Sequence, residues 1–278
     1  MGEIRFYKDF DFEYAVMETV SPMVRRIVAR NPGPLTGPGT GTYVIGHGNV
    51  AIIDPGPSMS SHVTALLHAL RGETIDKILI THSHPDHYPA ATPVQQASGA
   101  KIYGAWGDVH LQDGDTVEGD GWHFTAVHTP GHTSDHLAYA FEEENILFSG
   151  DHVMGWSTSV ILGGEGSLGD YMQSLDKVLA RVEAGNDKLY LPTHGTAVTD
   201  PRTHVRSFIE HRNDRTAAII ARLRQSDAST SQIVSAVYVG LSSALQWAAG
   251  ATVEAHLQHL MEQGIVEPTG GRYHLKKR

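Results

Sequence analysis

Residues 77–87 read Lys77-Ile78-Leu79-Ile80-Thr81-His82-Ser83-His84-Pro85-Asp86-His87, an apolar run followed at once by three histidines and an aspartate. The apolar run is typical of a buried strand. A strand end is rigid, and the loop after it can turn successive side chains towards one point. Histidine and carboxylate are common metal ligands, so this stretch predicts a metal site. His82 and His84 can face one metal ion, and Asp86 and His87 can face a second.

The cluster alone supplies too few ligands for two ions, because a tetrahedral zinc site needs about four. Three further candidates each follow a short apolar run, with small or rigid residues beside them. They are His132 in Thr129-Pro130-Gly131-His132-Thr133, Asp151 in Phe148-Ser149-Gly150-Asp151 and His194 in Leu191-Pro192-Thr193-His194-Gly195. One such residue would mean little, but three in series after the first cluster predict a set of metal ligands.

The other histidines are weaker candidates for metal ligands. His136 could orient a ligand or simply pack in the core. His152 directly follows Asp151, and in an extended segment its side chain should point the other way. The remaining histidines are scattered, and we expect them at the surface or packed in the core.

Around these motifs, strands alternate with helices as far as about residue 200. Apolar residues at helical spacing predict a helix over residues 59–71, which Gly72 ends. Candidate strands cover residues 42–45, 50–54, 101–103, 122–128, 137–141, 145–148 and 188–191. The mixture predicts an α+β fold with two sheets and outer helices.

After residue 200 the pattern becomes helical. Pro201 follows the candidate cap Asp200 and begins a predicted long helix. Two further helical stretches follow near 230–239 and 243–263, the second with a predicted break at Gly250. The chain then ends on a predicted short hairpin, and helices followed by a hairpin are similar to a winged-helix module.

Composition limits the classes of function. The chain has 278 residues, of which 40% are apolar and 19% charged, as in an ordinary globular protein. Cysteine is absent, which excludes disulfides, thiolate metal ligands and cysteine nucleophiles. The formal charge of -10 disfavours nucleic acid and anionic membranes. No apolar run approaches the roughly 18 residues of a membrane span, and the polar start is unlike a signal peptide, so we expect a cytoplasmic protein.

The ordered motifs resemble those of the metallo-β-lactamase superfamily over about residues 20–215. They are His82-x-His84-x-Asp86-His87, Pro130-Gly131-His132-Thr133, Ser149-Gly150-Asp151 and His194-Gly195. The resemblance implies a four-layer αβ/βα sandwich with the site at one edge between the sheets. It implies one metal held by His82, His84 and His132, a second held by Asp86, His87 and His194, and Asp151 as a bridge. An acidic bridge resembles the glyoxalase-II-like and nuclease-like branches.

A finer resemblance, to the β-lactamase-like protein 2 group, covers nearly the whole chain. It rests on Asn31-Pro32-Gly33, Gly39-Thr40-Gly41-Thr42-Tyr43, Glu143-Glu144-Asn145, Tyr171-Met172-Gln173-Ser174-Leu175 and His211-Arg212 before the helical tail. The group usually has Asn where Gly41 stands and a small residue where Tyr88 stands, which leaves substrate preference open. We name Tyr88 and Tyr171 as candidate substrate-binding residues, although Tyr171 could instead pack on the sandwich.

These observations predict a dinuclear zinc metallohydrolase. Two zinc ions about 3.5–4 Å apart can share a bridging hydroxide and lower the pKa of its parent water towards about 7. Asp86 and Asp151 are the candidate catalytic residues, because their carboxylates offset part of the metal charge. Iron or manganese also suits a site of histidines and carboxylates.

The expected substrate is a small molecule with a thioester, ester, lactone or lactam bond. Single-strand endoribonuclease activity, by resemblance, and β-lactamase activity are the alternatives. A non-enzymatic binding protein is the least favoured reading, because a degenerate site should have lost at least one ligand.

We expect residues 1–207 to form the catalytic domain and residues 208–278 a winged-helix-like domain. Residues 213–278 carry a formal charge of +2, so the preceding 212 residues carry -12. The candidate recognition helix contains Glu254 and Glu262 but no Lys or Arg, whereas helices that read a DNA groove present positive charge. The tail is therefore expected to act as a lid, a packing surface or a homodimer contact, with single-stranded RNA a disfavoured partner.

Overall fold

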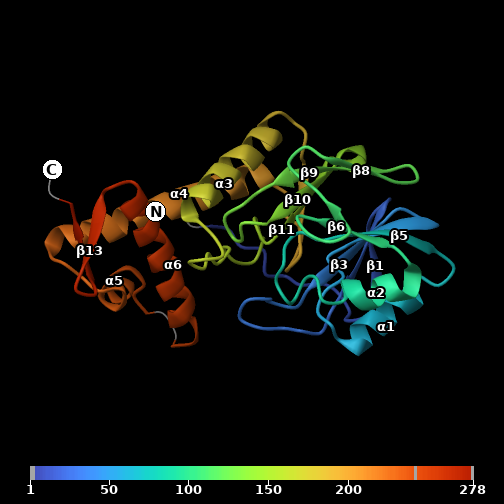
Figure 1. The fold of residues 1–278 in the computed structure, drawn as a ribbon, viewed down its shortest axis with the longest axis horizontal. Helices are drawn as coiled ribbons and strands as arrows, with labels where there is room; N and C mark the ends of the chain where they lie inside the picture. Colours follow the sequence, from blue (N-terminus) through green and yellow to red (C-terminus); the bar gives the residue numbers. More distant parts are fainter. Residues whose placement is uncertain (1–3, 241–242, 277–278) are drawn as a thin grey trace.

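The computed structural model describes residues 4–240 and 243–276, which form two facing β-sheets and flanking helices (Figure 1). The first sheet comprises, in spatial order, β1 (Met17–Ser21), β2 (Val24–Val28), β3 (Gly41–Ile45), β4 (Asn49–Ile53), β5 (Thr74–Leu79), β6 (Lys101–Gly104) and β7 (Val109–His110). The second comprises β12 (Leu189–Pro192), β11 (Ile146–Gly150), β10 (Leu137–Phe141), β9 (His123–His128) and β8 (Thr116–Glu118). A hairpin of β13 (Val266–Thr269) and β14 (Arg272–Leu275) follows near the end of the chain.

The helices lie outside the sheets or in the tail. They are α1 (Ser60–Ala69), α2 (Ala91–Ser98), α3 (Leu168–Glu183), α4 (Pro201–Gln225), α5 (Thr230–Val237) and α6 (Ser243–Glu262), with one 3-10 turn at Glu142–Glu144. Leu66 of α1 and Val94 of α2 pack against the outer face of the first sheet. Leu175 of α3 and Phe208 of α4 pack against the outer face of the second sheet. The order helix, sheet, sheet, helix is the four-layer sandwich expected from the sequence.

The apolar runs of the sequence are strands buried on both faces. In β4, Ala51 and Ile53 face the second sheet, whereas Val50 and Ile52 face α1 and α2. Successive side chains of a strand point to opposite faces, so a strand between two layers must be apolar at every position. β10 follows the same rule, and all five of its residues are buried. Because these strands are packed on both faces, their ends are held in place, and the candidate ligands project from strand ends.

Helix α4 joins the sandwich to the tail. Its cap is the predicted one, because the Asp200 carboxylate accepts a hydrogen bond from the Thr203 backbone N–H at 3.1 Å, and Pro201 stands in the first turn. The first half packs Val205 against the sandwich, and the second half packs Ile219 against the core of the tail. The helix runs without a break across the boundary that we predicted between residues 207 and 208, and that division stays a prediction.

The predicted break at Gly250 is wrong. Helix α6 continues through this residue from Ser243 to Glu262. A glycine inside a helix costs only about 1 kcal/mol relative to alanine. Val253 and Leu257, both fully buried in the core of the tail, anchor the helix beyond it. Among the helices of the described residues, none is long and apolar enough to cross a membrane.

Candidate metal centre

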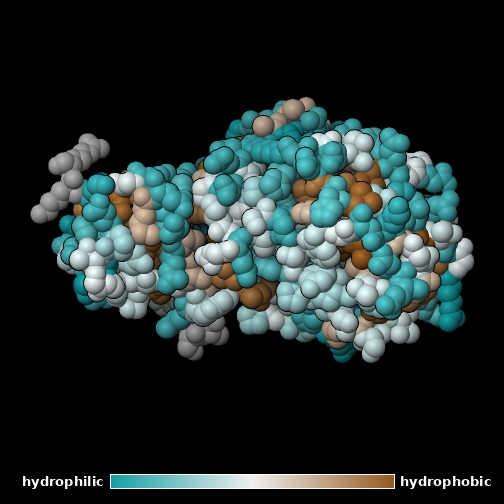
Figure 2. All heavy atoms as spheres, viewed as in Figure 1, coloured by the Kyte–Doolittle hydropathy of each residue, from teal (hydrophilic) through white to brown (hydrophobic). Residues whose placement is uncertain are grey.

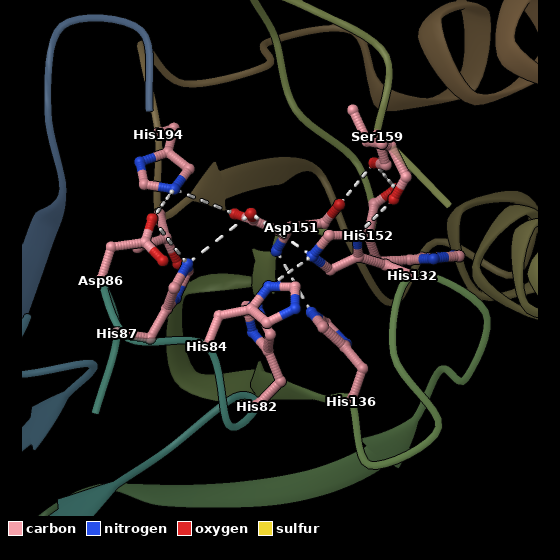
Figure 3. Close-up of polar contacts among 12 residues, drawn as sticks. His82, His84, Asp86, His87, His132, His136, Asp151, His152, Ser159 and His194 are labelled. Atoms are coloured by element: carbon pink, nitrogen blue, oxygen red, sulfur yellow. Dashed lines mark hydrogen bonds and ion pairs between the residues drawn. The ribbon is translucent and has the colours of Figure 1, made fainter. Parts of the chain in front are cut away.

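The candidate ligands all project from one edge of the sandwich. The loop after β5 carries His82, His84, Asp86 and His87, and the segments after β9, β11 and β12 carry His132, Asp151 and His194. β11 is parallel to β12, and β9 and β11 are both antiparallel to β10. The chain therefore leaves these three strands in the same direction, which brings their following loops to one edge. Figure 3 shows the seven side chains, here called the ligand cluster, converging there.

The ligand cluster contains two triads. In the first triad, His84 Nδ1 lies 3.0 Å from His82 Nε2 and 3.1 Å from His132 Nε2. In the second triad, Asp86 Oδ2 lies 3.1 Å from His194 Nε2 and 3.7 Å from His87 Nε2. Each triad places one potential ligand atom per residue within 4.8 Å of the other two. Two donor atoms that bind one zinc ion at about 2.0–2.2 Å with tetrahedral angles lie about 3.3–3.6 Å apart, and the four observed distances lie within about 0.3 Å of that range.

Asp151 lies between the two triads (Figure 3). Its Oδ2 is 3.7 Å from His132 Nε2 and 3.6 Å from His87 Nε2, and its Oδ1 is 3.5 Å from His194 Nε2. Burial would raise the pKa of this carboxyl group, but the neighbouring His194 and His87 outweigh it and hold the pKa well below its usual range. Asp151 therefore carries a negative charge at neutral pH, between two sets of ring nitrogens.

Several atoms of the cluster lack a partner inside the protein. His87 Nε2, His194 Nε2 and Asp151 Oδ1 are buried without a hydrogen-bond partner among the described residues. Buried polar atoms are nearly always satisfied, and each exception needs an explanation. Burial also lowers the pKa of His82 well below its usual value, which leaves that ring neutral with a free lone pair. A donor set of imidazoles and carboxylates fits a divalent cation.

The opposite side of each ring is held by the protein. His132 Nδ1 lies 2.6 Å from the carbonyl oxygen of Val160, and His194 Nδ1 lies 3.2 Å from that of Gly39. His82 Nδ1 lies 3.0 Å from Thr81 Oγ1. A carbonyl oxygen accepts only, so it fixes the proton on the nitrogen that faces it and leaves the other nitrogen as a ligand. In His84 the roles are exchanged: Nδ1 faces the cluster and Nε2 lies 3.3 Å from Glu165 Oε2.

Asp54 is a functional residue that the sequence analysis missed. It is fully buried at the end of β4, with a φ of 47° that is uncommon outside glycine. Its Oδ2 lies 2.8 Å from His87 Nδ1 and accepts hydrogen bonds from Thr81 Oγ1 at 2.7 Å and Thr193 Oγ1 at 2.9 Å. The available signal was an acidic residue directly after the apolar run of β4, which is the same rule that singled out Asp151.

We expect Asp54→Asn to weaken metal binding by about 10- to 100-fold, because the amide keeps the shape of the side chain but removes the charge that orients His87. Competition titration with a zinc indicator measures the dissociation constant. Asp120→Asn is the matched control, since Asp120 is exposed on the surface and should leave zinc affinity unchanged. Equal affinities in the two variants would show that Asp54 does not support the metal centre.

Two other buried histidines differ in role. His136 Nε2 accepts the backbone N–H of Asp151 at 3.1 Å, and His136 Nδ1 lies 2.8 Å from Thr129 Oγ1. His136 therefore positions the bridging segment, one of the two roles considered for it. The ring of His152 belongs to neither triad and packs edge-on against Tyr171, with ring centroids 5.0 Å apart.

The substrate contact predicted for Tyr171 is corrected by the structure. The side chain is fully buried in the core between α3 and the second sheet, and its hydroxyl donates to the carbonyl oxygen of His152 at 2.8 Å. Tyr171 therefore packs on the sandwich, which was the alternative prediction for this residue. Tyr88 is half-buried and packs edge-on against Trp106, with ring centroids 4.8 Å apart. Its contact with substrate stays a prediction.

A small cavity of about 70 Å³ opens beside the ligand cluster. It is lined by His84, Asp86, His132 and Asp151 and by the apolar residues Leu35, Met154, Val160, Leu162 and Trp247. Trp247 belongs to α6, so the tail supplies part of the wall of this cavity. The ligand cluster thus lies beside apolar groups from three separate parts of the chain.

Comparison with known proteins gives two family matches. The family described as the metallo-beta-lactamase superfamily matches residues 35–112 and 107–194, and the beta-lactamase associated winged helix domain matches residues 229–273. A beta-lactamase-like protein 2 homolog from Caenorhabditis elegans is 33% identical over 268 residues, which span 90% of this chain and 88% of that protein.

Two further proteins extend the comparison. An atrochrysone carboxyl ACP thioesterase from Aspergillus novofumigatus is 30% identical over 225 residues, which span 75% of this chain and 65% of that protein. The crystal structure of a beta-lactamase domain protein from Burkholderia ambifaria superposes with a TM-score of 0.84 at 20% identity, covering 98% of this chain and 97% of that one. By fold and by sequence, this chain belongs to the metallo-β-lactamase superfamily, with a C-terminal winged helix domain.

Proposed function

We propose that this protein is a dinuclear zinc hydrolase that cleaves a small thioester, ester, lactone or lactam. The observation that carries the proposal is the position of Asp151, whose two carboxylate oxygens lie within 3.7 Å of ring nitrogens from both triads. A single metal ion would leave one triad and one oxygen of this carboxylate without a partner. Members of the superfamily are hydrolases, which supports the same conclusion.

Each triad has a defined task in this proposal. His82, His84 and His132 hold one ion, and the second triad holds the other. A zinc pair supplies an activated water whose pKa falls to about 7 and a Lewis acid for the scissile carbonyl. Asp86 is also ionised at neutral pH, because His194 and His87 lower its pKa more than burial raises it. The carboxylates of Asp86 and Asp151 therefore offset part of the charge of two cations.

The surroundings of the metal centre favour a small acyl substrate. The cavity beside the ligand cluster has apolar walls, among them Leu162 and Trp247, which suit the carbon skeleton of an acyl group. One relative is named as a thioesterase that acts on an acyl carrier protein. Iron or manganese also suits the donor set, and elemental analysis of the purified protein identifies the metal.

Two basic side chains near the end of the tail are held by neighbours within the tail. The Lys276 ammonium lies 2.9 Å from a carboxylate oxygen of Glu267, and the Arg272 guanidinium donates to the carbonyl oxygen of Asp227. Both groups are therefore engaged within the tail. This pairing favours the hydrolysis of a small molecule over the cleavage of single-stranded RNA.

A panel of substrates tests the proposed function directly. Zinc-loaded protein is assayed with a small acyl thioester, a lactone, a β-lactam and single-stranded RNA, at low and high salt. We expect thioester hydrolysis to be fastest and to respond weakly to salt, since a small neutral substrate is not held by phosphate contacts. Rapid cleavage of RNA alone would overturn the proposal, and a β-lactam preference would select the lactam among the proposed substrates and contradict the expected thioester preference.

We expect the double change Arg272→Ala with Lys276→Ala to leave thioester turnover within about a factor of three, roughly 0.6 kcal/mol of barrier. Both residues lie in the tail and are absent from the lining of the cavity beside the ligand cluster. Steady-state kinetics at two salt concentrations measures the effect. Fast RNA cleavage that falls steeply with salt and disappears in this variant would identify a nuclease.

A further inference from the structure

A second, larger cavity adjoins the one beside the ligand cluster. It has a volume of about 410 Å³ and lies between loop residues 157–160, helix α4 and helix α6. Leu35, Val160 and Trp247 line both cavities, so the two share a wall. Leu35 and Trp247 are 48% and 58% exposed. Figure 2 shows hydrophobic atoms at the surface where the tail meets the sandwich.

Arg212 lines this larger cavity and has no acidic partner. The residue is 2% exposed, and no described carboxylate forms an ion pair with it. Its Nη2 donates to the carbonyl oxygen of Ser159, its guanidinium lies 5.1 Å from the centroid of the Tyr171 ring, and its Nε is buried without a partner. A buried charge without a counter-charge is costly, so such a group calls for an anion from outside the chain.

The groups that line the cavity with Arg212 leave its positive charge uncompensated. Burial and the charges of Arg212 and Arg215 lower the pKa of His211 to about 4, so this ring is neutral at pH 7. His211 lines the cavity, and its buried Nδ1 lacks a hydrogen-bond partner. No Asp or Glu lines this cavity among the described residues. The cavity therefore combines apolar walls, one cation and an unused polar atom on a neutral ring.

We propose that this cavity binds a carboxylate on the non-reacting part of the acyl substrate, with Arg212 as its counter-charge. The inference rests on the proposed function. The scissile bond of the substrate then lies at the ligand cluster, and the apolar part of the substrate lies against the residues that line both cavities. A planar guanidinium matches a carboxylate well, and a single cation balances a single negative charge. A phosphate could offer the same oxyanion chemistry, but its charge near -2 would exceed that of Arg212.

Paired thioesters test the inference on the unmodified, zinc-loaded protein. The N-acetylcysteamine thioesters of 4-carboxyphenylacetate and 4-carbamoylphenylacetate differ only in the charged group. We expect kcat/KM to be at least about tenfold higher for the carboxylate, mainly through KM, because the interaction lies away from the reacting carbonyl. The N-acetylcysteamine thioester of 4-phosphonophenylacetate carries a phosphonate at the same position of the acyl group. A preference for that compound, or no preference at all, would overturn the proposal.

Variants of Arg212 separate recognition of charge from a structural role. Arg212→Gln should reduce the preference for the carboxylate to about twofold or less, and Arg212→Lys should restore part of it. Arg206→Gln is the matched control, because Arg206 is exposed on the same helix α4, pairs with Glu183 and does not line the cavity. This control should keep the full preference. A purely structural Arg212 would lower turnover of both thioesters equally, which would contradict the inference.

Equilibrium binding separates this inference from the proposed function. Calorimetric titration with 2-naphthoate and 2-naphthamide in the presence of EDTA measures binding when no metal ion can hold the carboxylate. We expect 2-naphthoate to bind at least about tenfold more tightly than the amide, and Arg212→Gln to remove the difference. Binding that depends on Arg212, without hydrolysis of any thioester, would refute the proposed function and retain the anion site. Equal binding of the two compounds would refute the anion site.

Discussion

Zinc-loaded protein should contain close to two metal ions per chain, and removing them should abolish hydrolysis. The two triads and Asp151 supply seven ligands, and one tetrahedral ion uses about four. Inductively coupled plasma mass spectrometry measures the stoichiometry, and dialysis against a chelator followed by zinc addition measures loss and recovery of activity. Zinc at 100 times its dissociation constant should also stabilise the fold by about 2.7 kcal/mol for each site, which raises the Tm.

Single substitutions make this result diagnostic. His194→Ala should reduce the metal content to about one ion, because it removes a ligand of the second triad only. His68→Ala is the control, since His68 is exposed on α1 and belongs to none of the potential ligand groups among the described residues. A wild-type stoichiometry near one after zinc loading would contradict the dinuclear site.

Asp151→Asn should lower kcat/KM by at least about 10³-fold, or roughly 4 kcal/mol of barrier. The amide has nearly the same shape but no charge, and it replaces one carboxylate oxygen with a group that cannot serve as a ligand. The substitution should therefore lose metal as well as activity, while the far-UV circular dichroism spectrum stays that of the wild type. Steady-state kinetics and metal analysis on the same preparation measure both effects.

Asp176→Asn is the control for this variant, because Asp176 is exposed on α3 and the same charge is lost there. Its activity should stay within about a factor of two of the wild type. If Asp151→Asn kept two metal ions and near-normal turnover, Asp151 would have no bridging role.

The sequence predicted the fold and the ligand cluster because both depend on local patterns. The apolar runs give the strands, and ligands such as His132 directly follow strand ends. Asp54 escaped notice because its role depends on His87 and Thr193, which are far away in the chain and meet it only in the folded sandwich. The break predicted at Gly250 is wrong for the reverse reason, since burial of α6 outweighs a local preference.

Burial is the other property that the sequence did not supply. A tyrosine beside a glycine-rich loop could face a substrate or the core, and Tyr171 lies entirely in the core. Arg212 is one of many basic residues in the sequence. Its lack of an acidic partner follows from the packing of α3, α4 and the loop at Ser159 around it, which the sequence does not show. In both cases, the role of the side chain depends on residues that contact it only in the folded protein.

The hydrogen bonds of Asp54 have a consequence for how the protein admits its substrate. This carboxylate at the end of β4 accepts bonds from Thr81, after β5 of the first sheet, and from Thr193, after β12 of the second. The two halves of the sandwich are thus tied together at the edge where the ligands project. A shearing or hinge motion between the sheets would break a buried charged network. Any widening of the cavity beside the ligand cluster would therefore have to come from walls that Asp54 does not hold, such as Leu35 and Trp247.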